Sequence, residues 1–396
     1  MTSEAPGEKG SGGRSFSLQG DYSVLFVVAI ILIASLGCLF VAQAFTQRPI
    51  HLVNPFFLGY DFHDFFVGGQ AIAHHQNPYD ASRYVTPPLP ALITSPMSGM
   101  NFADVAPYVC AASVASVVLG IVLFVFALKR ENKWPLILAA VALTSVGFPF
   151  CFLIDRGNID GFVFLFVGLF AFFLSRKQPW LAGIALGLGA CLKVYPLLLL
   201  APLLLRRQYK AAGAVVLTLL ASVAVQPGLW LAYVPNLFTR VSGFRTDENG
   251  SVAVVLKLLL FPFSEQNNRL LSVALLGVVA IVLIRCLQLD RKRNIPDVDL
   301  IVEYLPFMMA IPAVVYLYSF VNIVPVLFLL SRRMWFATVG YALTQFNAVA
   351  WQQATGTTAL HVLPSLGLVM IIGALLMEKT RAAQAFEGSE SGPSER

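Results

Sequence analysis

The amino-acid sequence predicts an all-α protein that crosses a membrane many times. Of its 396 residues, 57% are hydrophobic and only 12% are charged, and the mean hydropathy is +0.74. A soluble domain of this size cannot bury that much apolar surface. The apolar residues also come in runs whose length, about 20 residues, suits a helix that spans a bilayer.

Eight apolar runs predict single spans, at 24–45, 107–128, 135–153, 159–175, 211–228, 270–287, 336–350 and 361–377. Two further runs, 180–205 and 301–331, each begin and end beside basic residues, so each is expected to enter the membrane and return. Lys193 and Pro196 lie in the middle of the first of these runs and predict a break between two short helices. With each of these two runs counted as a hairpin, we expect roughly 10 to 12 crossings.

The charged residues predict the orientation of the chain. Basic side chains form short clusters at the ends of apolar runs, and such clusters are typical of cytoplasmic loops. They place both termini in the cytoplasm and the long loop 46–106 on the outer face. The formal net charge of +6 therefore follows from topology, and we expect no nucleic-acid partner. The clusters are Lys129 to Lys133, Arg176 with Lys177, Arg206 to Lys210, Arg291 to Arg293, Arg332 with Arg333, and Lys379 with Arg381.

One membrane domain is expected from residue 21 to residue 380, since the apolar runs leave no room for a soluble domain. The tails 1–20 and 381–396 are rich in Gly, Ser and Glu and are expected to be disordered and cytoplasmic. Within the loop 46–106, residues 62–75 predict a short interfacial helix. The proline-rich run 87–90 predicts an extended, semi-rigid segment.

Asp61 is the first candidate for chemistry, because it follows the first span and lies between Tyr60 and Phe62 at the expected interface. A partly desolvated carboxylate there can act as a general base toward an acceptor hydroxyl. A helix cap or a solvated charge is the alternative interpretation. Asp64, three residues on and on the same helix face, is the second candidate.

Lys193 is an ionisable residue at the apex of a predicted hairpin, where a phosphate is a natural partner and snorkelling to the interface is the alternative. In the turn that follows the third span, Arg156 can pair with Asp155 or Asp160, or it can face a phosphate. Asn158 in the same turn can bind a sugar hydroxyl. The histidines lack the spacing of a metal site, and we expect neither a metal nor another cofactor.

Five motifs occur in a characteristic order: Asp61–Gly69, Asn77–Asp80, Gly157–Asp160, Ala182–Pro196 and Asn249–Val252. Together they resemble glycosyltransferase family 87. This family of integral-membrane enzymes belongs to the GT-C superfamily and includes polyprenyl-phosphate-mannose-dependent α-1,2-mannosyltransferases. The resemblance covers residues 20–330, roughly from the first span to the end of the second hairpin.

The resemblance implies a GT-C-like bundle with a long first outer loop that carries the active site. It also implies transfer of a hexose, mannose in particular, from a polyprenyl-phosphate donor to a glycolipid or glycan acceptor at the outer face of the cell membrane. Asp61 would be the general base and Lys193 would contact the donor phosphate. We assign to the donor site Lys193, Arg156, Asn158, Asp160 and Tyr195, and to the acceptor site His63, Tyr79 and Tyr84.

Two other classes of function remain open from the sequence. Broken helices and a lysine at membrane depth also suit a transporter or flippase of a lipid-linked saccharide. A structural subunit of an envelope-assembly complex is the third possibility.

Overall fold

Every element in the described part of this computed structural model is a helix, which confirms the predicted all-α class. The structure describes residues 25, 27–33, 36, 58–81, 84–129, 133–241, 265–291, 293, 295–310, 316–330, 334–347, 350, 351, 355 and 362–390. Its first helices are α2 (Tyr60–Ala73), α3 (Pro78–Ala81), α4 (Pro88–Thr94), η2 (Ser95–Met97), α5 (Phe102–Ala127), α6 (Lys133–Val146), α7 (Phe148–Arg156), α8 (Asp160–Ser175) and α9 (Pro179–Leu192). The remaining helices are η3 (Tyr195–Leu199), α10 (Leu200–Leu205), α11 (Tyr209–Val225), α12 (Pro227–Val241), α14 (Glu265–Asp290), α15 (Asp297–Ala310), η4 (Leu317–Phe328), α16 (Trp335–Thr344) and α18 (Val362–Glu390).

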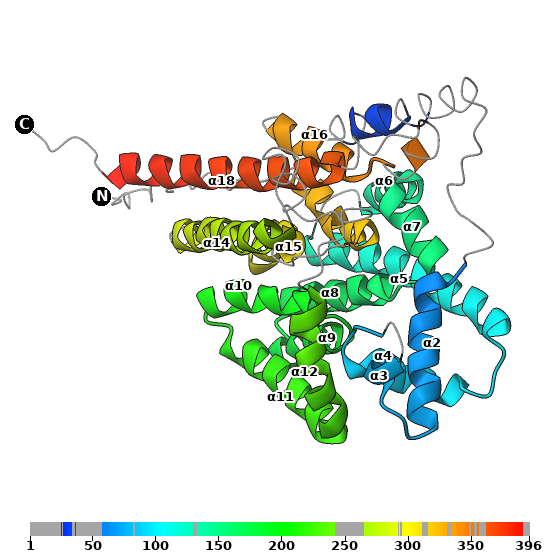
Figure 1. Cartoon of the computed structure of the whole chain (residues 1–396). Helices are drawn as coiled ribbons and strands as arrows, with labels where there is room; N and C mark the ends of the chain where they lie inside the picture. Colours follow the sequence, from blue (N-terminus) through cyan, green and yellow to red (C-terminus); the bar gives the residue numbers. More distant parts are fainter. Residues whose placement is uncertain are drawn as a thin grey trace, which may run out of the picture.

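The predicted spans after the first coincide with helices (Figure 1). Most of the first span, 24–45, lies outside the described residues. By length and composition, two helical stretches of the described chain can each cross a membrane, Phe102–Ala127 and Val362–Ala385, or up to four can if each of two bent helix pairs is one span. The chain is an all-α membrane protein, with fewer full-length spans in its described part than the 10 to 12 crossings we predicted.

Prolines account for part of this difference, because they divide some apolar runs into shorter helices. The pair α6 and α7 bends by 66°, next to Pro149 in the first turn of α7. The predicted break at Lys193 is confirmed: α9 ends at Leu192 and Lys193 has an extended backbone. Pro196 accounts for this end, since its ring would clash with the carbonyl group of Leu192, four residues earlier, if the helix continued.

Two local predictions need correction. The run 87–90 is not an extended segment, because α4 begins at Pro88; a proline is tolerated in the first turn of a helix, where its missing N–H would have no partner. Helix α18 continues to Glu390 and so includes part of the tail 381–396, where alanines favour helix. The tail 1–20, the final residues 391–396 and the part 46–57 of the outer loop lie outside the described residues.

Glycines allow three pairs of helices to pack with their backbones close together. A methyl group at Gly161 of α8 would lie 2.7 Å from the Ser113 carbonyl oxygen of α5. One at Gly183 of α9 would lie 2.2 Å from the Ala211 carbonyl oxygen of α11, and one at Gly367 of α18 would meet α16 in the same way. Close approach through small residues is typical of helix packing in membranes.

A buried cluster of four charges joins α14, α15 and α18, which lie side by side in Figure 1. Arg293 lies 2.7 Å from both Asp290 and Glu303, and Lys379 of α18 contacts the same two carboxylates. Two positive and two negative charges therefore balance. Lys379 is 1% exposed. Its loss would leave two buried carboxylates with only one positive charge to balance them.

We predict that Lys379→Met destabilises the detergent-solubilised protein by about 3–5 kcal/mol, because removing one partner of a buried ion pair leaves an unpaired charge. The thermal unfolding midpoint measures the effect. Arg381→Ala is the matched control, since Arg381 is exposed and lies 3.8 Å from Glu378. Equal midpoints for the two variants would contradict the prediction.

Candidate active site

The start of α2 rests on the turn between α7 and α8, and this contact places Asp61. The Gly59 N–H group donates to the Asp155 carbonyl oxygen at 2.9 Å. Gly59 and Gly157 both have positive φ, 82° and 59°, which glycine adopts without strain. A methyl group at Gly157 would lie 2.8 Å from the Gly59 Cα atom, so only glycine allows the two turns to meet this closely. The first turn of α2 therefore faces the residues that follow Gly157.

The Asn158 side chain links the two halves of the site. Its Nδ2 atom donates to Asp61 Oδ2 at 2.7 Å. Its Oδ1 atom accepts from Lys193 Nζ and from the Asp160 N–H group, each at 3.1 Å. Because both of these partners are donors, the orientation of the amide is determined, and Nδ2 must face the carboxylate.

Asp160 is completely buried at the start of α8. One carboxylate oxygen accepts from Lys193 and the other from the Tyr195 hydroxyl group. The ammonium group and the N-terminus of the helix both compensate the buried negative charge. The break after α9 is what allows Lys193 and Tyr195 to reach the same carboxylate.

Arg156 brings a second positive charge to Asp61. Its Nη1 atom lies 3.8 Å from Asp61 Oδ1. The guanidinium group is also held between two aromatic rings, 4.9 Å from the ring centre of Tyr60 and 4.8 Å from that of Phe152. Stacking of this kind restricts the side chain and keeps its charge at the edge of the site.

Helix η4 contributes two residues that sequence analysis missed, Tyr318 and Asn322. The Tyr318 hydroxyl group lies close enough to Asp61 to lower the pKa of that carboxyl group, and the Tyr318 ring centre lies 4.9 Å from Lys193 Nζ. The Asn322 amide donates to the Tyr195 hydroxyl group at 3.1 Å. A signal for both existed, since polar side chains inside an apolar run are usually functional in membrane proteins.

The predicted base, Asp61, has a shifted acidity. Burial raises the pKa of its carboxyl group above the ordinary value, against the hydrogen bond from Asn158 and the charges of Arg156 and Lys193, which lower it. A carboxylate with a raised pKa is a better proton acceptor than an ordinary aspartate. Asp64 is half-buried one turn further along α2.

The three predicted acceptor residues contact other groups. His63 is exposed, with its ring 5.2 Å from that of Phe102. The Tyr79 hydroxyl group donates to the Thr86 carbonyl oxygen at 3.0 Å, and that of Tyr84 accepts from the Ala91 N–H group at 3.1 Å. Both tyrosines are buried, which raises their pKa values, and they pack α3 and α4 together.

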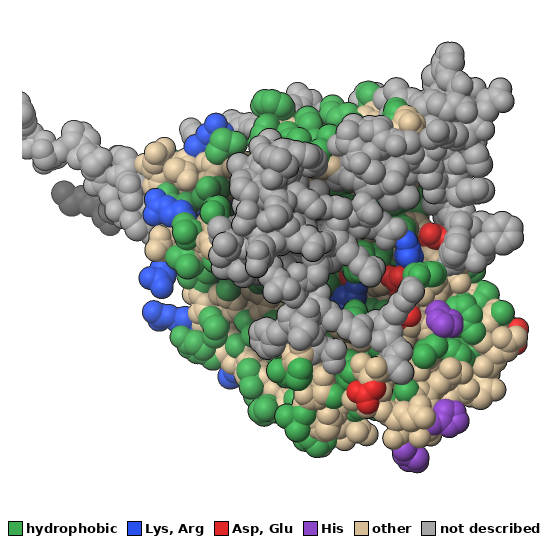
Figure 2. All heavy atoms as spheres, in the orientation of Figure 1, with side chains coloured by type: hydrophobic (Ala, Val, Ile, Leu, Met, Phe, Trp, Pro, Cys, Tyr) green, Lys and Arg blue, Asp and Glu red, His purple; other side chains and the backbone are tan. Residues whose placement is uncertain are grey.

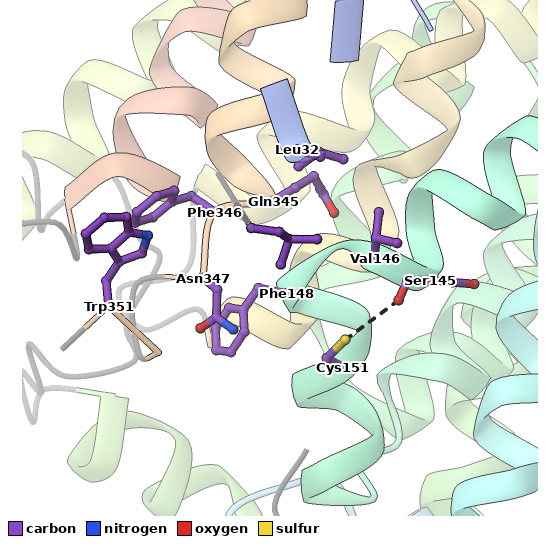
Figure 3. A pocket seen from close by; sticks show the side chains of 10 residues that line it. Leu32, Ser145, Val146, Phe148, Cys151, Gln345, Phe346, Asn347 and Trp351 are labelled. Atoms are coloured by element: carbon purple, nitrogen blue, oxygen red, sulfur yellow. Dashed lines mark hydrogen bonds between the residues drawn. The ribbon is translucent and has the colours of Figure 1, made fainter. Parts of the chain in front are cut away.

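A cavity of about 150 Å³ lies at the other end of α7 (Figure 3). Phe148 lines the cavity and stacks on Phe152 with ring centres 5.0 Å apart, and Phe152 in turn contacts Arg156. A row of packed side chains on one face of α7 therefore runs from the cavity to Arg156. Its lining residues are mainly apolar: Leu32, Leu36, Ser145, Val146, Phe148, Cys151, Gln345, Phe346, Asn347 and Trp351.

The cluster combines a proton acceptor with two cations, and its charges balance when all are ionised. Asp61 and Asp160 carry two negative charges, and Arg156 and Lys193 carry two positive charges. In Figure 2, acidic and basic side chains adjoin near the middle right of the surface, apart from the basic side chains that gather at the left edge. Such an arrangement can take a proton from a hydroxyl group and receive an anionic leaving group.

A family model described as glycosyltransferase family 87 matches residues 84–312, which is more than half of the chain. The match includes Arg156, Asn158, Asp160, Lys193 and Tyr195. Asp61 and the two residues of η4 lie outside it. No curated protein matches the chain.

We predict that Gly157→Ala lowers the free energy of unfolding by roughly 1–3 kcal/mol, and with it the thermal unfolding midpoint. The added methyl group would be forced against Gly59, at a residue whose φ is positive. Gly213→Ala is the control, since no atom lies within 4 Å of a methyl group there and alanine favours the interior of α11. A midpoint for Gly157→Ala at or above that of Gly213→Ala would show that the turn tolerates a side chain.

Proposed function

The chain belongs to glycosyltransferase family 87 and is a membrane glycosyltransferase, and we propose that it transfers a hexose from a polyprenyl-phosphate donor to a glycolipid or glycan acceptor. Mannose is the expected sugar. We place the reaction at the outer face of the cell membrane, with both termini cytoplasmic and residues 21–380 forming one transferase domain. The family favours a transferase over the flippase and structural-subunit alternatives.

The observation that carries this proposal is the contact of Asp61 with Asn158, Tyr318 and Arg156, beside Lys193. A glycosyl transfer that displaces phosphate needs a base for the attacking hydroxyl group and positive charge for the departing anion. Asp61 has the raised pKa that suits the first task. Arg156 and Lys193 provide the charge for the second.

Proton transfer and phosphate departure are coupled through the charge balance of the site. As the acceptor oxygen bonds to the anomeric carbon, its proton passes to Asp61. The bond from that carbon to the phosphate oxygen breaks, and its electron pair leaves with the phosphate. Once Asp61 is neutral, the two cations exceed the remaining carboxylate by one charge, and this excess stabilises the leaving group as it forms.

The cavity at the start of α7 supports a donor that carries a hydrocarbon chain. Its lining is mainly apolar, and α7 is 9 residues long. At the rise of an α-helix this corresponds to roughly 13 Å between the cavity and Arg156. An isoprenoid chain whose phosphate lies against Arg156 can reach the cavity over that distance.

The location at the outer face is supported by charge. The ends of α10, α14 and α18 lie together: Arg206 donates to the Arg293 carbonyl oxygen, and Lys379 pairs with Asp290. Most of the basic side chains visible in Figure 2 gather at the left edge, where these helix ends lie in Figure 1. Helix α2, with Asp61, lies on the other side (Figure 1). Basic side chains mark the cytoplasmic face of membrane proteins.

We predict that Asp61→Asn lowers kcat for transfer by about 10²–10⁴-fold, the usual contribution of a general base. The assay offers purified protein polyprenyl-phosphate mannose, glucose and arabinose separately, with a glycolipid extract as acceptor, and measures released polyprenyl phosphate. Asp104→Asn is the control, since Asp104 is exposed in the first turn of α5, and it should retain most activity. A folded Asp61→Asn variant with full activity would refute the assignment of the base.

A second prediction concerns pH. Asp61 must be ionised to accept a proton, so kcat/KM rises as pH rises through its pKa, and burial places this midpoint above the value of about 4 for an ordinary aspartate. Arg156→Gln removes a positive charge that lowers this pKa and should move the midpoint to higher pH. Arg176→Gln, whose guanidinium group packs on Phe172, should leave it unchanged. A midpoint that moves to lower pH in Arg156→Gln would contradict the prediction.

A further inference from the structure

Asn322 is a buried polar residue in the apolar helix η4, and its amide group has an incomplete set of hydrogen bonds. The side chain is 1% exposed. Its Nδ2 atom donates to the Ser319 carbonyl oxygen at 2.9 Å and to the Tyr195 hydroxyl group at 3.1 Å. Its Oδ1 atom is one of the buried side-chain atoms without a hydrogen-bond partner in the described part of the chain.

The partners of this amide determine which of its two ends is the nitrogen atom. A carbonyl oxygen can only accept, so the atom that faces Ser319 must be the nitrogen. The oxygen is then left without a donor. An unpaired buried acceptor is unfavourable, and in native proteins it is usually satisfied by something that the protein binds, either water or a ligand.

The unpaired oxygen belongs to the candidate active site. Nδ2 and Oδ1 are bonded to the same carbon atom, and Nδ2 contacts the Tyr195 hydroxyl group. Tyr195 contacts Asp160, whose other carboxylate oxygen is held by Lys193. Both oxygens of Asp160 are therefore occupied, and the cations of the site can only donate. Asn322 Oδ1 is a neutral acceptor on the side chain that contacts Tyr195, one hydrogen bond away from Asp160.

We infer that Asn322 is a specificity residue, whose Oδ1 atom accepts a hydrogen bond from one hydroxyl group of the transferred sugar. The inference rests on the proposed function, because it takes the donor sugar to lie beside Lys193. A hexose presents several hydroxyl donors, and each one that is buried on binding needs an acceptor. A donor that lacks the matching hydroxyl group would leave Oδ1 unpaired in the complex, and sites of this kind reject such analogues strongly.

The experiment measures kcat/KM for the natural polyprenyl-phosphate hexose and for its monodeoxy analogues, one position at a time. The wild-type protein should turn over one analogue about ten- to a hundredfold less efficiently than the parent donor, the effect of one unpaired buried group. Asn322→Leu has a similar side-chain volume without the acceptor. It should lower kcat/KM for the parent donor and bring that analogue to within about threefold of it.

Tyr195→Phe is the matched control, because it removes the hydroxyl group that Asn322 and Asp160 share and leaves Oδ1 in place. It should lower kcat/KM for the parent donor and every analogue by the same factor, so that the discrimination of the wild-type protein is kept. Thermal unfolding and gel filtration check that each variant is folded. Asn322→Ala replaces Asn322→Leu if the larger side chain prevents folding.

Two outcomes overturn the inference alone: a wild-type protein that does not discriminate against any deoxy analogue, or an Asn322 variant that discriminates as the wild type does. The second would make Asn322 a support for Tyr195 only. Absence of transfer by folded wild-type protein with any polyprenyl-phosphate hexose would overturn the proposed function, and the inference with it.

Discussion

The hydrogen bonds of the Asn158 side chain are the interaction on which the candidate site depends. Asn158 holds Asp61 from one side and Lys193 from the other, so that a carboxylate and a cation share one amide. Neither charge could be buried here alone at acceptable cost. With Asp160 and Arg156 beside them, two carboxylates are balanced by two cations. In the proposed mechanism, the cluster gains positive charge when Asp61 takes up a proton.

Four segments that are distant in the sequence meet at the candidate site. Two glycines with positive φ, Gly59 and Gly157, let the start of α2 lie against the turn before α8. Pro196 ends α9 at the residue before Lys193, which turns that side chain toward Asp160. Helix η4 closes the cluster with Tyr318. Each of these devices interrupts a regular helix, and irregular backbone is tolerated in a membrane protein where it is buried or lines a site.

Much of the site could be predicted before the structure was known. The sequence predicts six site residues that the structure brings into one network: Asp61, Arg156, Asn158, Asp160, Lys193 and Tyr195. The family resemblance also implies Tyr79 and Tyr84, but their hydroxyl groups bond to nearby backbone and they pack short helices together. A motif shows which residue types recur near a site. It does not show whether a hydroxyl group already has a partner.

The sequence by itself determined the all-α membrane class, the positions of most apolar helices and the break at Lys193, because these depend on hydropathy, proline and charge, which act locally along the chain. Only the tertiary structure decided which polar residues meet. Tyr318 and Asn322 lie more than 120 residues after Lys193 in the sequence, and no local pattern links them to it. Hydrogen bonds across such separations depend on how the helices pack, and so does the unpaired oxygen of Asn322.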